Sequence, residues 1–253
     1  MDGGRYQGLG GAAKRAALIS KIRKDNKHTL LLDAGDMWQG TPYFNFFHGE
    51  VEFKLMSEMK YDAVTLGNHD FDAGLDGLLK QLPLATFDIL SCNYNFQNTV
   101  LKDKFKPYKI FEKGGSRIGV IGVGIELKNL VLPKHFEGVI YEDPIKRVNH
   151  FATILRKKER CDLVICLSHL GYSYSNDKVS DITLAKESED VDLILGGHTH
   201  TFLERPIPII NKKNQVIHIS QTGWAGINLG KIDFERHSIL KSTNTSTSLI
   251  KIN

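Results

Sequence analysis

Four short polar motifs in this sequence combine Asp, Asn and His residues, and each follows an apolar run with the length of a β-strand. The motifs are Gly35-Asp36, Gly67-Asn68-His69-Asp70, Ser168-His169 and Gly196-Gly197-His198-Thr199-His200. The runs before them cover residues 29–33, 63–66, 162–167 and 192–195. Carboxylate, amide and imidazole ligands without a thiolate suit Mn²⁺, Fe or Zn²⁺ better than they suit a structural zinc finger. The pattern therefore predicts a metal-dependent hydrolase.

Each of these residues also has an ordinary interpretation when it is taken alone. An isolated Asp36 favours a turn or a helix N-cap, and an isolated Asn68 favours a turn. A single His169 is more often a near-surface histidine than a ligand. His198 and His200 are two residues apart, so their side chains point to the same side of an extended segment. Because the ordinary interpretation needs four coincidences at four strand ends, the motifs together favour a metal site.

The composition is that of an ordinary globular protein. The chain has 253 residues, of which 41% are hydrophobic and 25% are charged, and this length is enough for one large domain with a substantial core. The formal net charge of +4 is compatible with an anionic substrate. It gives no evidence for binding to nucleic acid, and we expect none.

The number of cysteines and the hydropathy of the chain indicate in which cellular compartment the protein is located. Cys92, Cys161 and Cys166 are too few and too irregular for a disulfide framework, so we expect buried free thiols. No apolar run approaches the roughly 18 residues of a membrane span. The residues after Met1 do not resemble a signal peptide. The sequence as written indicates a cytoplasmic protein, whereas an export signal upstream would indicate a periplasmic or extracellular one.

Predicted helices and strands alternate along most of the chain. Helices are expected at 9–24, 48–60, 74–82, 143–160 and 178–189, with Asp143 as an N-cap and Pro144 in the first turn. Strands are expected at 88–92, in a hairpin over 108–123 that turns at Gly114-Gly115, and at 208–210, 216–219 and 227–234. This order predicts an α/β fold in which helices cover both outer faces of packed sheets. Ligands bind at the carboxyl ends of strands in such folds, where the four motifs are expected.

The motifs resemble those of the calcineurin-like metallophosphoesterases. More closely, they are similar to the catalytic domain of the 5'-nucleotidase / UDP-sugar hydrolase / 2',3'-cyclic phosphodiesterase family. The segments Met37-Trp38-Gln39-Gly40-Thr41-Pro42 and Gln221-Thr222-Gly223 also fit that branch. The resemblance implies a four-layer α/β/β/α sandwich. It also implies hydrolysis of a small-molecule phosphate ester such as a nucleotide, as in a 5'-nucleotidase.

The resemblance also implies a binuclear metal site with two divalent ions, such as Mn, Zn or Fe. Asp36 would bridge the two ions through its two carboxylate oxygens. Asn68, His169 and His198 would complete one ion's ligand set, and His200 would belong to the other. A metal-bridging hydroxide would then attack the phosphorus atom in line with the leaving group.

Two further residues receive catalytic roles from the resemblance. His69 would donate a proton to the phosphoryl or leaving-group oxygen. Asp70 would hold the imidazole of His69 in the correct tautomer and raise its basicity.

The sequence departs from the family pattern in two places. The family begins with a strand that ends in Asp-x-His, and no such motif precedes Asp36, so we expect the fold to lack its first strand. One metal site would then be incomplete, with only Asp36 and His200 as ligands. We expect residues 1–240 to form an N-terminally incomplete catalytic domain and residues 241–253 to form a tail or a linker. Family members also carry a C-terminal domain that binds the nucleobase.

Three hypotheses follow from these departures. The chain is an active binuclear enzyme whose start lies upstream of Met1, or it is a non-catalytic or single-metal binding protein of phosphatase fold. Alternatively, it is a catalytic half that works with a separately encoded nucleotide-binding domain.

Overall fold

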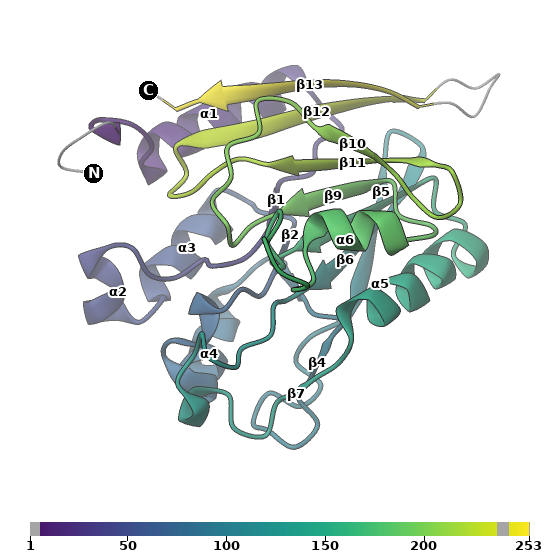
Figure 1. The fold of residues 1–253 in the computed structure, drawn as a ribbon. Helices are drawn as coiled ribbons and strands as arrows, with labels where there is room; N and C mark the ends of the chain where they lie inside the picture. The colour runs from purple at the N-terminus through teal and green to yellow at the C-terminus, as the bar shows by residue number, and fades with distance from the viewer. Residues whose placement is uncertain (1–5, 237–242, 253) are drawn as a thin grey trace.

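The structure, a computed structural model, describes residues 6–236 and 243–252. Two sheets of unequal size form its centre (Figure 1). The smaller sheet is parallel and has the order β1-β2-β3, formed by Leu32–Asp33, Ala63–Thr65 and Asp88–Leu90. The larger sheet has the order β10-β11-β9-β8-β6-β5. Its strands are β5 Tyr108–Lys113, β6 Ser116–Val123, β8 Leu163–Ser168, β9 Leu193–Gly196, β10 Ile207–Ile210 and β11 Val216–Gln221.

Helices cover the outer face of each sheet. α1 (Ala12–Asp25), α3 (Glu50–Glu58) and α4 (Gly74–Gln81) pack over the small sheet through a cluster that includes Ile19, Phe53 and Leu78. α5 (Pro144–Thr153) and α6 (Asp181–Glu187) pack over the large sheet. A third apolar cluster, with Leu90 from one sheet and Leu167 from the other, lies between the sheets. These contacts confirm the predicted α/β fold with α/β/β/α layers.

The predicted elements are found with small shifts at their ends. The hairpin turns at Gly114 and Gly115, which both have positive φ angles and therefore need glycine. Asp143 caps α5, because its Oδ1 accepts a hydrogen bond from the backbone N–H of Lys146 at 3.0 Å. The helix expected up to residue 160 ends at Thr153 and continues as a π-helical turn over Ile154–Lys158.

Some elements differ from the sequence prediction. The expectation of a tail or linker is wrong for Thr243–Lys251, which form β13 and pair antiparallel with β12 (Asn228–Arg236). The Ser/Thr-rich composition suggests a linker, but threonine is β-branched and has a high strand propensity. Residues 241, 242 and 253 lie outside the described part of the chain. The sequence also did not predict the short helix α2 (Pro42–Phe47) or the pair β4 (Tyr94–Asn95) and β7 (Ile140–Tyr141).

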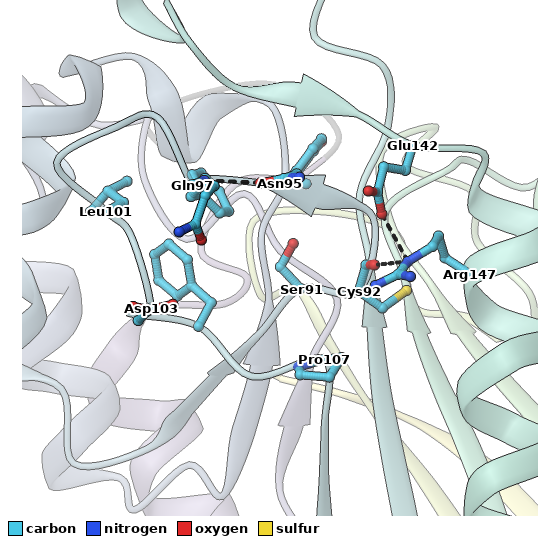
Figure 2. A pocket seen from close by; sticks show the side chains of 12 residues that line it. Ser91, Cys92, Asn95, Gln97, Leu101, Asp103, Pro107, Glu142 and Arg147 are labelled. Atoms are coloured by element: carbon cyan, nitrogen blue, oxygen red, sulfur yellow. Dashed lines mark hydrogen bonds and ion pairs between the residues drawn. The ribbon is translucent and has the colours of Figure 1, made fainter.

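A cavity of about 220 Å³ is lined mainly by the segment that follows β3, and no residue of the four polar motifs is among its lining residues (Figure 2). Arg147 lines it and is held by the carboxylate of Glu142 at 2.9 Å and the carbonyl of Cys92 at 2.8 Å. The buried Oγ atom of Ser91, also in the lining, has no partner among the described residues. This polar lining suits a water molecule that would hydrogen-bond to Ser91.

No helix in residues 6–236 and 243–252 combines the length and the apolar composition that crossing a membrane requires.

A buried carboxyl group joins the end of β8 to the start of α6. The Oδ1 atom of Asp181 accepts a hydrogen bond from Ser168 Oγ at 2.5 Å, and Ser168 Oγ accepts one from the backbone N–H of Leu170. The Oδ2 atom of Asp181 has no hydrogen-bond partner within the described residues. Burial raises the pKa of Asp181 to about 7. The folded protein therefore keeps this proton at pH values where the unfolded chain has lost it.

This raised pKa predicts how stability depends on pH. Between pH 3.8, the ordinary pKa of an aspartate, and about pH 7, the folded protein holds a proton that the unfolded chain has released. The free energy of unfolding therefore falls as pH rises through this range. Asp181→Asn carries no such proton. We expect its stability relative to the wild type to increase with pH in that window, by up to about 1.4 kcal/mol per pH unit. Urea denaturation of the metal-free proteins from pH 4 to pH 8 measures this difference. A difference that is independent of pH would contradict the assignment.

Candidate metal centre

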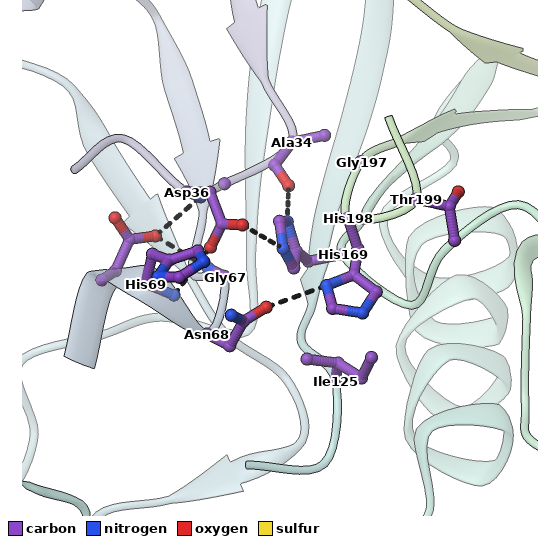
Figure 3. A network of polar contacts seen from close by, with 12 residues as sticks. Ala34, Asp36, Gly67, Asn68, His69, Ile125, His169, Gly197, His198 and Thr199 are labelled. Carbon is purple, nitrogen blue, oxygen red and sulfur yellow. Dashed lines mark hydrogen bonds and ion pairs between the residues drawn. The ribbon is translucent and has the colours of Figure 1, made fainter. Parts of the chain in front are cut away.

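The four polar motifs meet where four strands from two different sheets end (Figure 3). Asp36 follows β1 and Asn68 follows β2 in the small sheet, whereas His169 follows β8 and His198 follows β9 in the large sheet. Their convergence agrees with the prediction that the motifs lie at one edge of the sheets.

Asp36, His169 and His198 each offer one ligand atom, and these atoms lie within 4.8 Å of one another. Asn68 joins them, because its Oδ1 lies 2.8 Å from Nδ1 of His198. The Nε2 atom of His169 lies 3.0 Å from Oδ2 of Asp36. Two donor atoms that bind one transition-metal ion are about 3 Å apart, because each lies about 2.1 Å from it. Both pairs therefore have the spacing of ligands that share a cation.

The surroundings of His169 identify which of its nitrogen atoms can bind a metal. The imidazole is 1% exposed, and its Nδ1 donates a hydrogen bond to the carbonyl of Ala34 at 2.6 Å. This bond leaves the Nε2 lone pair directed at Asp36. The buried Nε2 makes no hydrogen bond of acceptable geometry within the described residues. A lone pair that faces a carboxylate is unfavourable unless a proton or a metal cation lies between them, so this arrangement fits a metal ion.

The electrostatics of the group couple Asp36 to His169 and keep the other two histidines neutral. Burial raises the pKa of Asp36, but His169 and the backbone N–H and charge of His69 together outweigh burial and bring that pKa below its ordinary value. Burial lowers the pKa of His169, but the Asp36 carboxylate, the Ala34 carbonyl and Asp70 together reverse this and raise it. Burial and the charge of His169 lower the pKa of His198 to about 4. Burial also lowers the pKa of His200, so both of these imidazoles are neutral near pH 7 and can bind a metal.

His200 lies outside the group formed by Asp36, His169 and His198. Its exposed imidazole stacks on Trp224, with the ring centroids 5.9 Å apart. Within the described residues, the structure therefore brings together four of the five predicted ligands and places the fifth beside them.

The backbone of the site is unusual. Asp36, His198 and His200 have positive φ angles of 58°, 67° and 54°. Non-glycine residues rarely adopt this region, and they do so most often at functional sites. Gly67 has a different constraint, because a Cβ atom there would overlap Oδ1 of Asp36 and Cε1 of His169. Only glycine therefore lets the end of β2 approach the metal-binding side chains this closely.

Asp70 has a different role from the one that the sequence predicted. Its buried carboxylate accepts hydrogen bonds from the backbone N–H groups of Asp36 at 3.0 Å, Met37 at 2.9 Å and Gly67 at 2.8 Å. Burial and the nearby Asp36 raise the pKa of Asp70 to about 7. The predicted contact between Asp70 and the His69 imidazole is wrong. Asp70 instead fixes the turn that carries Asp36.

The carboxylate next to the His69 imidazole belongs to Asp72. Its Oδ2 lies 2.7 Å from Nδ1 of His69, and the His69 side chain is exposed. The backbone N–H of His69 donates to Oδ1 of Asp36 at 2.8 Å. Sequence reasoning missed Asp72, although its spacing from His69 contained the signal. Side chains three residues apart lie on the same side of a 3₁₀ turn, and His69–Phe71 form such a turn.

Comparisons with known proteins agree with this geometry. The family model of the calcineurin-like phosphoesterases matches residues 8–202. A snake venom 5'-nucleotidase from Crotalus adamanteus is 37% identical over 80% of this chain and 34% of its own length. A 5'-nucleotidase from Vibrio cholerae is 36% identical over 81% of this chain and 39% of its own length. These curated relatives are therefore much longer than the chain described here.

A solved structure shows the same fold. The 5'-nucleotidase precursor from Thermus thermophilus superposes with a TM-score of 0.86 and 29% identity, over 96% of this chain and 49% of that one. The matching family model, the relatives and the grouped ligands confirm the resemblance that the four motifs indicated. The chain belongs to the calcineurin-like phosphoesterase family.

Proposed function

We propose that this chain hydrolyses a nucleotide phosphomonoester in a metal-dependent reaction, as a 5'-nucleotidase does. The observation that carries the proposal is the convergence of one donor atom each from Asp36, His169 and His198 within 4.8 Å, with Nε2 of His169 at 3.0 Å from the Asp36 carboxylate. The substrate class follows from the relatives, which are named as 5'-nucleotidases. A phosphate ester is anionic, which suits a site that is built to concentrate positive charge.

The ligand assignment extends the observed grouping. Asp36, Asn68, His169 and His198 would hold one divalent ion, and Asp36 and His200 would contribute to a second one. Mn, Zn or Fe all accept this set of oxygen and nitrogen ligands. When bound, the ions polarise the phosphate and lower the pKa of a coordinated water.

His69 and Asp72 would handle the proton of the reaction. Asp72 accepts from Nδ1 of His69, so a second proton, which makes the ring an imidazolium, would lie on Nε2 and face the exposed side of the site. The leaving-group oxygen of a phosphate ester gains negative charge as its bond to phosphorus breaks, and a proton from His69 would neutralise it. Asp72 is therefore assigned to orient His69, the role that the sequence gave to Asp70.

One observation favours a second candidate function. Within the described residues only one complete group of candidate ligands is found, and His200 lies outside it. A single-metal binding protein of phosphatase fold would need no more than this group. A separately encoded nucleotide-binding domain and a location outside the cytoplasm both stay predictions.

The number of metal ions bound per chain distinguishes the enzyme from the single-metal binding protein. In Asp36→Asn, the negative charge that faces His169 is lost, so we expect both metal content and hydrolysis to disappear. Metal per chain after Mn²⁺ loading and the hydrolysis of AMP and p-nitrophenyl phosphate are the measurements, with Asp103→Asn as a surface control. Two ions with turnover support the enzyme, and one ion without turnover supports the binding protein. Unchanged metal content in Asp36→Asn would contradict both.

Two variants test the roles proposed for His69 and Asp72. His69→Asn should lower kcat about a hundredfold or more, the usual loss for a positioned general acid, while metal content stays at the wild-type value. Asp72→Asn should lower kcat in the same direction, because its neutral amide can still accept from Nδ1 but no longer offers a negative charge to a protonated imidazole. Steady-state kinetics with AMP, combined with metal analysis, measures both effects. An unchanged kcat in His69→Asn would refute its role.

Substitution of Asp70, the residue next to His69, should have a different effect from substitution of Asp72. Asp70→Asn replaces an acceptor of three backbone hydrogen bonds by an amide with one acceptor oxygen, so the Asp36 turn loses support. We expect weaker Mn²⁺ binding, measured by calorimetric titration, in Asp70→Asn and wild-type Mn²⁺ affinity in Asp72→Asn. The reverse pattern would show that Asp70 and Asp72 have been assigned the wrong way round.

A further inference from the structure

The loop of residues 197–201 holds both histidines of the fourth motif in an unfavourable backbone conformation. His198 and His200 have φ angles of 67° and 54°, and a residue with a Cβ atom adopts this region only when the surroundings hold it there. The loop follows β9 directly, so the surroundings that hold it must come from elements packed beside that strand.

One buried side chain supplies much of this support. Gln221 is 1% exposed and lies at the end of β11, paired with Gly196 at the end of β9. Its Nε2 donates to the carbonyl of Gly197 at 2.8 Å. Its Oε1 accepts from Thr199 Oγ1 at 3.2 Å and from the backbone N–H of Thr201. These hydrogen bonds use both polar atoms of the amide.

The positions of these contacts matter more than their number. Gln221 bonds to Gly197, Thr199 and Thr201, which are the residues on either side of His198 and of His200. Each histidine therefore lies between two residues that the same amide holds. A side chain that only closed a gap in the core would not need contacts spaced in this way.

Thr199 links Gln221 to the rest of the site. Its Oγ1 accepts from the backbone N–H of Tyr172 at 2.9 Å and lies 3.0 Å from Oγ1 of Thr201. The backbone N–H of Gly197 donates to the carbonyl of Ser168, the residue before His169. The histidine loop is thus fastened to Gln221 on one side and to the segment that carries His169 on the other.

We propose that Gln221 is a positioning residue of the metal centre, because its amide maintains the left-handed backbone of His198 and His200. The inference rests on the proposed metal-binding function. Without the amide, the loop is free to relax to ordinary φ angles. Relaxation would turn both imidazoles away from the positions they hold relative to Asp36.

Manganese affinity tests the inference directly. Gln221→Met keeps the length of the side chain and removes its hydrogen bonds. We expect Mn²⁺ to bind this variant about 10- to 100-fold more weakly than the wild type, the usual effect of removing a residue that orients metal ligands. Isothermal titration of the full chain with Mn²⁺ measures the affinity, and urea denaturation without metal measures stability.

A second buried amide serves as the control. Asn211 is 4% exposed and lies in the turn between β10 and β11, where its Oδ1 accepts from the backbone N–H groups of Lys213 and Gln215 at 2.9 Å. Asn211→Ala should lower stability and leave the Mn²⁺ affinity unchanged. Equal weakening of Mn²⁺ binding in both variants would mean that loss of any buried amide disturbs the site, and would overturn the inference.

Substitutions at Thr199 test the same support without altering Gln221, and they remain informative if Gln221→Met does not fold. Thr199→Val removes the hydroxyl and should weaken Mn²⁺ binding, whereas Thr199→Ser keeps the hydroxyl and should retain it. In the double variant with Gln221→Met, Thr199→Val should weaken Mn²⁺ binding less than it does alone, because both substitutions release the same loop. Independent, fully additive effects would contradict the inference.

The results distinguish the inference from the function on which it rests. Wild-type affinity in both Gln221→Met and Thr199→Val, alongside normal Mn²⁺ binding by the wild type, would overturn the inference and leave the proposed function intact. Absence of Mn²⁺ binding by the wild-type chain would overturn both.

Discussion

The site depends on the contact between the Asp36 carboxylate and the His169 imidazole. Asp36 follows a strand of the small sheet and His169 follows a strand of the large one, so the contact forms only when the two sheets pack face to face. The bond from Nδ1 of His169 to the carbonyl of Ala34 directs Nε2 toward the carboxylate at 3.0 Å. A buried carboxylate and an imidazole nitrogen at this distance attract a cation. The packing of the apolar layer between the sheets therefore determines the geometry on which the chemistry depends.

Buried polar side chains hold the loops that present the ligands. Asp70 joins the turn of Asp36 to the end of β2, because it accepts from two backbone N–H groups of that turn and from the N–H of Gly67. Gln221 contacts the loop of His198 and His200 at three positions. Both loops contain residues with positive φ angles, so each holds backbone strain that the polar contacts offset. Fully paired networks of this kind rigidify a site, because breaking one bond leaves a buried group without a partner. The same arrangement holds the side chains of Asp36, His198 and His200 in place without help from an ion.

The strand ends and the polar side chains that follow them could be predicted from the sequence, because apolar runs followed by polar residues identify the carboxyl edge of a sheet. Asp36, Asn68, His169 and His198 meet there as expected. The partner of His69 could not be chosen by proximity in sequence, because adjacent residues of a 3₁₀ turn point in different directions. Asp70 consequently turns inward to the backbone, while Asp72 reaches His69. The strand Thr243–Lys251 was missed because composition alone does not distinguish a threonine-rich linker from a paired strand.

Anomalous diffraction from crystals grown with Mn²⁺ would test the central claim most directly, because it locates the ion without relying on activity. The account predicts an anomalous peak enclosed by the side-chain donor atoms of Asp36, Asn68, His169 and His198, with the bond from His169 to Ala34 retained. A second peak between Asp36 and His200 would support the binuclear form. A well-ordered site with no peak beside His169, or a peak bound only by other residues, would contradict the account.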